Sequence, residues 1–174
     1  MILRLASLDD AEAIREIYNR EVTESTVTFD LVPRTLDEQR QWLTDRSGAH
    51  TAVVAVDSIS ISSSDSGIES EVIVGFGSLS PFRDRPAYST TVENSVYVHR
   101  GHQGAGVGRA LLGDLVERAT NHGFHAMIAR IVGGHEASIN LHASLGFEIV
   151  GHEREVGRKF GKWLDVVVME RLLG

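Results

Sequence analysis

The sequence predicts an α/β protein in which a mixed, mostly antiparallel central sheet of about seven strands carries helices on both faces. Three observations support this prediction. Apolar strand-like runs alternate with amphipathic helical segments, two helical segments come early, and the chain ends on two long strand-like runs. We expect one domain over residues 1–174, because this length suits a single hydrophobic core.

Local signals place each element in order. Residues 2–5 indicate a strand, and Ser7 with Asp10 predicts the cap of a helix that buries Ile14 and Ile17. Residues 27–29 are extended, and a capping box over residues 35–38 predicts a second helix that ends near Gly48. The remaining expected elements are strands at 51–56, 72–79, 88–98 and 126–132, helices from 107 to near 123 and over 136–144, and a hairpin of 148–160 and 163–172 with its turn at Gly161–Lys162. The Ser-, Asp- and Gly-rich stretch 57–71 predicts a mobile surface loop without a function of its own.

Composition excludes several classes of protein. The 42% apolar and 24% charged content is ordinary for a soluble globular chain, and no apolar run is long enough for a membrane span. The N-terminus becomes charged too early for a secretory signal. No cysteine is present to form a disulfide, a thiolate metal site or a nucleophile, and the net charge of −7 argues against nucleic acid as a partner. We therefore expect a soluble, cytoplasmic protein.

The most informative segment is the glycine-rich run of residues 101–108, which joins a strand to a helix. Glycines at 104, 106 and 108 let the backbone approach a bulky ligand, and the first helical turn presents N–H groups to an anion. Val107 stands where a Walker loop needs Lys, and Arg109 stands at the third glycine of a dinucleotide fingerprint. The pattern Gln/Arg-x-x-Gly-x-Gly/Ala is met from Gln103 to Gly108, although a purely structural glycine turn is the alternative for this motif alone.

This pattern resembles the acetyl-coenzyme A signature of the GNAT N-acetyltransferase superfamily. Further segments resemble its phosphinothricin or methionine sulfoximine acetyltransferase branch, and these are residues 17–19, 25–29, 81–88, 91–98, 141–147 and 155–165. Several motifs in the right order over nearly the whole chain are more specific than the glycines. The resemblance implies the GNAT fold, acetyl-coenzyme A as co-substrate, and a small amino-acid-like acceptor such as phosphinothricin or methionine sulfoximine.

The implied cofactor site depends mainly on backbone atoms. The end of a strand at residues 96–98 would pair with the pantetheine arm as an added strand does. His135 stands where the family usually has Asn, so its contact with the cofactor is open, and the Arg109 side chain could equally be a solvated helix residue. The expected cofactor-binding residues are Val96, Tyr97, Val98, Gln103, Gly104, Ala105, Gly106, Val107, Gly108, Arg109 and His135.

Two titratable side chains are the expected catalytic residues. Glu93 matches the family's catalytic glutamate and would accept a proton from the acceptor ammonium, directly or through a water, if burial raises its pKa from about 4.3. His142 stands where many members have Tyr and would donate a proton to the departing sulfur. A backbone N–H near Val98 would stabilise the oxyanion. A solvent-facing glutamate and a structural histidine are the alternatives, and no metal is expected.

Acceptor binding is expected from side chains around the strand that carries Glu93. Arg83 and Arg85 could hold a carboxylate or phosphinate through their guanidinium groups, or be loop charges. Phe29 and Tyr88, with Phe82, could form a pocket wall or ordinary core.

The terminal hairpin suggests contact with a second subunit. The resemblance implies a homodimer in which Lys159, Phe160 and Trp163 reach the neighbouring chain, although they could also be surface and core residues. Two other functions stay open: a GNAT enzyme for a different amino acid or an amine antibiotic, and a non-catalytic coenzyme A sensor. The presence of both expected catalytic residues argues against the sensor.

Overall fold

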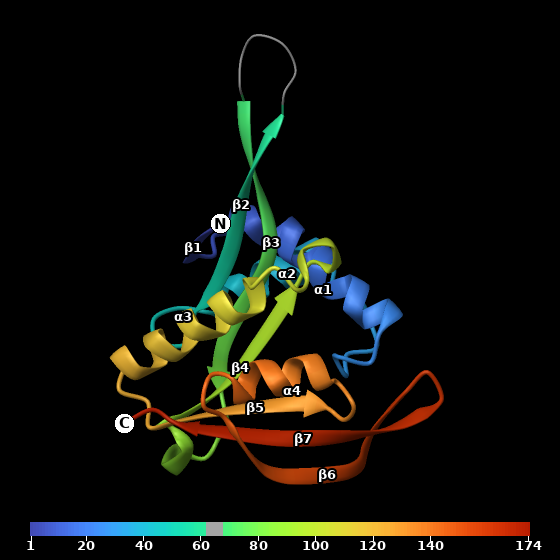
Figure 1. Ribbon diagram of the computed structural model, residues 1–174, viewed down its shortest axis with the longest axis vertical. Helices are drawn as coiled ribbons and strands as arrows, with labels where there is room; N and C mark the ends of the chain where they lie inside the picture. Colours follow the sequence, from blue (N-terminus) through green and yellow to red (C-terminus); the bar gives the residue numbers. More distant parts are fainter. Residues whose placement is uncertain (62–67) are drawn as a thin grey trace.

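The computed structural model describes residues 1–61 and 68–174, and seven strands in this part of the chain form one mixed sheet (Figure 1). The strands are β1 Ile2–Leu5, β2 Ala52–Ile61, β3 Ile68–Pro81, β4 Thr91–Val98, β5 Ala126–Val132, β6 Glu148–Lys159 and β7 Lys162–Leu172. Their spatial order is β1-β2-β3-β4-β5-β7-β6, and within it the β4–β5 pair is parallel while the other pairs are antiparallel. The predicted fold class is confirmed.

Helices cover both faces of the sheet, as predicted (Figure 1). The four α-helices of the described residues are α1 Ala11–Glu24, α2 Leu36–Thr44, α3 Val107–Asn121 and α4 Glu136–Ala143. Strand β2 shows how the sequence assigns the faces. Val53 and Ala55 pack under α3, whereas Val54 and Val56 alternate to the face of α1 and α2. No helix in the described part of the chain is long and apolar enough to cross a membrane.

Both predicted helix starts are confirmed by their caps. The Ser7 backbone N–H donates to Asp10 Oδ2 at 2.7 Å, ahead of a short 3₁₀ turn that leads into α1. Thr35 Oγ1 accepts from the Glu38 N–H at 3.2 Å while Glu38 Oε2 accepts from the Thr35 N–H at 2.7 Å. Reciprocal caps of this kind satisfy N–H groups that the helix itself cannot pair.

The expectation of a loop over residues 57–71 is wrong at both ends of that stretch. Strand β2 runs on to Ile61 and β3 begins at Ile68, with Ser58 paired to Glu71 between them. Serine and isoleucine alternate over residues 58–61, and this period of two is a strand signal that the serine-rich composition obscured. Residues 62–67 lie outside the described part of the chain.

Three smaller boundaries also differ from the expectation. Strand β4 begins at Thr91, because residues 86–88 form a 3₁₀ turn. Residues 27–29 belong to the irregular connection between α1 and α2. The β6–β7 turn lies at Phe160–Gly161, one residue earlier than predicted, and both residues have positive φ (50° and 75°), as a tight hairpin turn requires.

The feature that creates the site is the early end of the β4–β5 pairing. The two strands pair from Thr91 to Glu93 and from Ala126 to Ile128, but β4 continues to Val98 and β5 to Val132. The two strands therefore separate beyond Glu93, and the backbone of β4 is paired with β3 on one side only over this stretch.

Candidate active site

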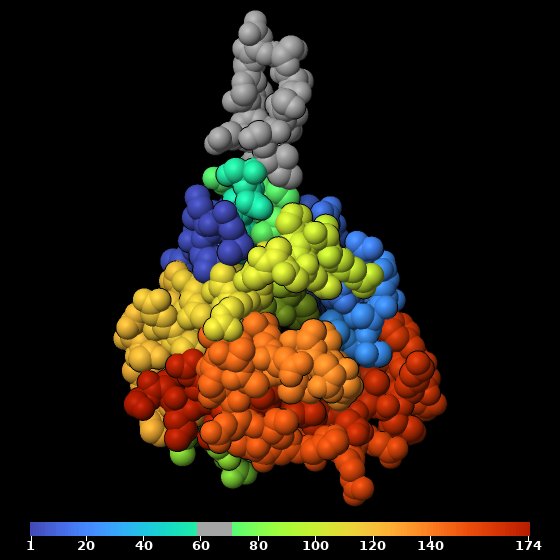
Figure 2. All heavy atoms as spheres, in the orientation of Figure 1, coloured from blue at the N-terminus to red at the C-terminus, as the bar shows by residue number. Residues whose placement is uncertain are grey.

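A cleft of about 140 Å³ lies where β4 and β5 separate. Figure 2 shows a hollow in this region, bordered by α4 in orange, by the segment before α3 in yellow-green and by the end of α1 in blue. The residues that line the cleft come from α1, the α1–α2 connection, β4, the turn before α3, β5 and α4. They are Glu21, Val27, Glu93, Asn94, Ser95, Val96, Tyr97, Val98, Gln103, Ala129, Arg130, Ile131, Val132, His135, Ser138 and His142. Both expected catalytic side chains and five of the expected cofactor-binding residues are among them.

Glu93 is the last residue of β4 that pairs with β5. Burial raises the pKa of its carboxyl, while the positive charge of Arg130 lowers it and the negative charge of Glu153 raises it. A carboxylate with a raised pKa is a better proton acceptor near neutral pH than an exposed one. The environment of Glu93 therefore meets the condition on which its expected role depends.

His142 is held from both of its ring nitrogens. Its Nδ1 lies 2.8 Å from the Ser138 carbonyl oxygen, and its Nε2 lies 3.1 Å from Asn94 Oδ1. The orientation of the Asn94 amide is fixed, because its Nδ2 donates to the Ile128 carbonyl at 3.1 Å. Both ring nitrogens thus face acceptors, and both contacts are hydrogen bonds only when each nitrogen carries a proton.

The two acceptors favour the doubly protonated His142 ring, whereas burial favours the neutral ring. His142 is 4% exposed, and burial lowers its pKa while the bond to the Ser138 carbonyl raises it. A neutral ring can satisfy one of its two neighbours, and a second proton completes the other bond. His142 can therefore take up and release a proton within the cleft.

The glycine turn leads into α3 with its helix start uncapped by any side chain. Gly104 and Gly106 have positive φ (78° and 84°), and a Cβ at either position would meet nothing within 4 Å. Gly108 differs, because a Cβ there would lie 3.2 Å from Leu141 Cδ2. The first two glycines shape an open turn of the kind that exposes backbone N–H groups to an anion, and the third lets α4 pack closely on α3.

The remaining expected cofactor residues lie around this turn. Gln103 and His135 line the cleft, and His135 stands at the start of α4, where burial lowers its pKa while the charge of Glu21 raises it. The Arg109 side chain donates to Ser144 Oγ at 2.7 Å, so it contacts α4. Ala105 lies in the turn, and Val107 is the first residue of α3.

The structure does not bring the expected acceptor-binding residues into the cleft. Arg83, Arg85 and Tyr88, with Asp84, line a separate depression on the β3–β4 connection. Phe29 packs on Gly157 of β6, where a Cβ would lie 2.3 Å from the Phe29 ring.

Lys159 is directed into its own chain. It is 3% exposed, and its Nζ donates to the Thr28 carbonyl at 2.8 Å and reaches the Glu21 carbonyl at 3.4 Å. The expectation that it reaches a neighbouring subunit is wrong for this side chain. Phe160 and Trp163 are 57% and 59% exposed.

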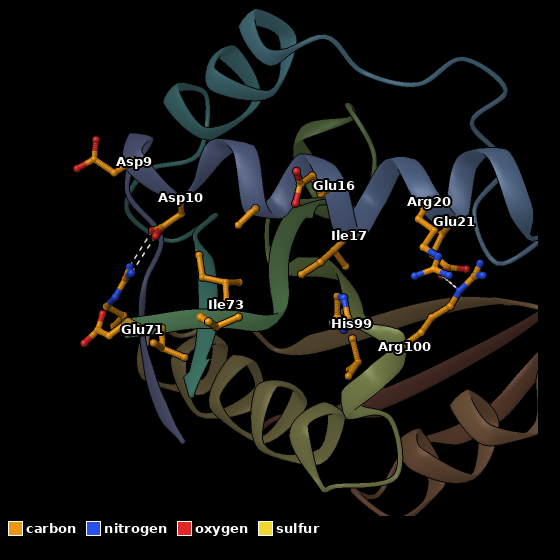
Figure 3. Close-up of a pocket in the computed structure, with 15 residues that line it drawn as sticks. Asp9, Asp10, Glu16, Ile17, Arg20, Glu21, Glu71, Ile73, His99 and Arg100 are labelled. Carbon is orange, nitrogen blue, oxygen red and sulfur yellow. Dashed lines mark hydrogen bonds and ion pairs between the residues drawn. The ribbon is translucent and has the colours of Figure 1, made fainter. Parts of the chain in front are cut away.

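A larger depression of about 600 Å³ lies between α1, the β2–β3 strands and the segment after β4 (Figure 3). Two ion pairs join the elements around it. Arg4 binds Asp10 with two hydrogen bonds of 2.7 and 2.8 Å, and Arg100 binds Glu21 at 2.9 Å. These pairs attach the sheet edge and the start of the glycine turn to α1, which is a structural role.

Asn94 and Arg130 are among the polar residues of the cleft that sequence reasoning missed. Arg130 interrupts the apolar run of residues 126–132, and Asn94 stands within the strand run of residues 91–98 although Asn is disfavoured in strands. A polar residue in such a run needs a partner or a ligand, and this signal could have identified both.

Comparisons with known proteins identify the family of this chain. The model of the acetyltransferase (GNAT) domain family matches residues 3–168. The chain is 40% identical to a phosphinothricin N-acetyltransferase of Streptomyces coelicolor over 95% of this chain and 92% of the relative. It is 36% identical to an L-methionine sulfoximine/L-methionine sulfone acetyltransferase of Salmonella typhimurium over 98% and 93%.

A solved structure shows the same fold. The phosphinothricin acetyltransferase of Sinorhizobium meliloti in complex with acetyl-coenzyme A superimposes with a TM-score of 0.88 and 38% identity, over 99% of this chain and 88% of that one. The chain therefore belongs to the GNAT family of acetyltransferases and is an N-acetyltransferase similar to the phosphinothricin and methionine sulfoximine enzymes.

Proposed function

We propose that this chain transfers the acetyl group of acetyl-coenzyme A directly to the amine of a small amino-acid-like acceptor, such as phosphinothricin or methionine sulfoximine. The observation that carries the proposal is that Glu93 and His142 both line the cleft where β4 and β5 separate. The named substrates of the relatives and the acetyl-coenzyme A in the Sinorhizobium meliloti complex support the same conclusion.

The residues present fit acetyl-coenzyme A. The uncapped start of α3 and the open turn at Gly104 and Gly106 would hold the pyrophosphate, and the unpaired side of residues 96–98 would hold the pantetheine arm. The co-substrate supplies a thioester, whose carbonyl carbon is the electrophile. Gly108 and Arg109 would act through the backbone of the first helical turn.

Glu93 and His142 divide the proton transfers of this reaction. Forming an amide from an ammonium removes two protons from the nitrogen. Glu93 would accept the first proton, directly or through a water, which frees the lone pair for attack on the carbonyl carbon. As the new C–N bond forms and the C–S bond breaks, His142 Nε2 would deliver a proton to the sulfur and recover one from the nitrogen.

Five further parts of the expectation stay proposals. We infer a homodimer, because the β6–β7 hairpin exposes large apolar side chains, including Val156, Phe160 and Trp163. That residues 1–174 form one domain is supported by the single sheet of the described residues. That the protein acts in the cytoplasm and that no metal takes part are predictions. The roles of Arg83, Arg85, Tyr88 and Phe29 toward the acceptor also stay predictions.

An acceptor panel tests the proposed function. Thiol release from acetyl-coenzyme A would be measured with phosphinothricin, methionine sulfoximine, other amino acids and amine antibiotics. We expect the first two to be acetylated, and Glu93→Gln to lower kcat by about 10²- to 10⁴-fold while binding of the co-substrate changes little. Release with only another amine would correct the acceptor, and co-substrate binding without any release would identify a sensor.

A further inference from the structure

Arg130 is the cation of the cleft. Among the described residues that line it, Arg130 is the one with a permanent positive charge, and Glu21 and Glu93 supply negative ones. Glu21 is already paired with Arg100, which lies outside this lining. An acceptor that carries its own carboxylate therefore meets one available positive charge there.

The strand register places Arg130 beside the expected reaction centre. Glu93 is opposite Ile128 in the parallel β4–β5 pair, and residues opposite one another point to the same face. Arg130 follows Ile128 by two residues, so it shares this face and lies about 6.6 Å further along β5. Met127 and Ala129 alternate to the other face and enter the core under α3.

In the structure Arg130 is bound by an exchangeable partner. Its guanidinium forms an ion pair with Glu153 of β6, and the two side chains are 43% and 38% exposed. A pair this exposed contributes little to stability and can be replaced by another carboxylate. A planar guanidinium holds an incoming carboxylate or phosphinate through two parallel N–H donors.

We propose that Arg130 binds the carboxylate of the amino-acid acceptor, with Glu153 as the counter-ion that the acceptor displaces. The amine, one carbon away from the carboxylate, is then directed toward Glu93. This inference rests on the proposed function and assigns to Arg130 the anion recognition that the sequence suggested for Arg83 and Arg85. Selection for α-amino acids over simple amines follows from it.

Two acceptors that differ by one carboxylate test the proposal. L-methionine sulfone and its decarboxylated counterpart, 3-(methylsulfonyl)propan-1-amine, would be compared in the thiol-release assay with the full chain. The variants are Arg130→Gln, Arg130→Lys and Glu153→Gln, with Arg154→Gln as a control because Arg154 is an exposed arginine of β6 that does not line the cleft. Measurements are made where activity no longer rises with pH.

We expect Arg130→Gln to raise KM for methionine sulfone by about 10- to 100-fold, the range for loss of a charge-assisted hydrogen bond, and KM for the amine by less than about threefold. Arg130→Lys should give an intermediate value. Glu153→Gln should leave KM for the amino acid unchanged or lower, and the control should match the wild type. Equal effects of Arg130→Gln on both acceptors, or no effect on either, would overturn the proposal.

Binding separates this inference from the proposed function. Calorimetric titration of methionine sulfone into the protein with coenzyme A present requires no turnover. If the wild type releases no thiol with any acceptor, the proposed function fails, and the inference stands only if Arg130→Gln still weakens this binding. Equal binding to both proteins, or none to either, would refute it.

Discussion

Replacement of Asn94 is the sharpest test of how the cleft is built. Asn94→Ala removes the donor to the Ile128 carbonyl and the acceptor that faces His142 Nε2, each at 3.1 Å. Asn94 is 5% exposed and His142 4%, so water does not readily replace either bond. Two net hydrogen bonds at about 1 kcal/mol each, plus a penalty of about 1 kcal/mol or more for the orphaned carbonyl, give a loss of about 3 kcal/mol.

For a domain of this size, that loss lowers Tm by about 6–12 °C. Thermal unfolding followed by circular dichroism measures it, and Asn140→Ala, at an exposed position of α4, is the matched control and should shift Tm by less than about 2 °C. A decrease of less than 2 °C in Asn94→Ala would show that the amide does not hold the two elements together.

A second variant tests the electrostatic part of the same reasoning. Asn94→Asp keeps an oxygen toward His142 Nε2 and adds a negative charge, which favours the charged ring. In the wild type, burial holds the pKa of His142 below 6.5, so folding stability is lost as the pH falls through about 6.5 and the unfolded chain gains the proton. An NMR titration of the ring should show a higher pKa in Asn94→Asp, and an unchanged value would refute the proposed contact.

Three further predictions concern the packing of β6 on the α1–α2 connection and the pKa of Glu93. Gly157→Ala should destabilise the protein, because the new Cβ would lie 2.3 Å from the Phe29 ring, and adding Phe29→Ala should recover part of the loss in a double-mutant cycle of Tm. Lys159→Met leaves the Thr28 carbonyl without its donor and should lower the free energy of unfolding by about 1–3 kcal/mol, measured by denaturant unfolding. An unchanged midpoint would contradict this prediction. Since burial raises the pKa of Glu93, kcat/KM should fall on the acid side with an apparent pKa above 4.5, and that limb should be absent from the residual activity of Glu93→Gln.

Much of the fold could be predicted from local patterns. Capping boxes at Ser7 and Thr35 mark helix starts, because the partners of a cap lie within three residues of one another in the sequence. The β2–β3 ribbon is longer than the expected strands, because the serine-rich composition of residues 57–71 obscures the alternation of serine and isoleucine at residues 58–61.

Site residues could be predicted only where they belong to a recognisable sequence motif. Glu93, His142 and the glycine turn belong to recognisable motifs, and the structure brings Glu93, His142 and Gln103 to one cleft. The pairs that depend on tertiary contact have no local signal. Lys159 is bound by the Thr28 carbonyl 131 residues earlier, and Arg130 is paired with Glu153 across an intervening strand.

The end of the β4–β5 pairing explains why one asparagine matters to both fold and chemistry. Backbone groups that leave a sheet ladder need new partners if they stay buried. At the first position beyond the paired residues, the Asn94 side chain donates to the Ile128 carbonyl in place of the missing strand contact. The same amide presents its oxygen to His142, which lies on the opposite face of β4 from Glu93. Asn94, the first residue beyond the pairing, therefore also positions the proposed proton donor, His142, across the cleft from the proposed proton acceptor, Glu93. The opening of the sheet and the proposed arrangement of the reaction thus depend on the same residue.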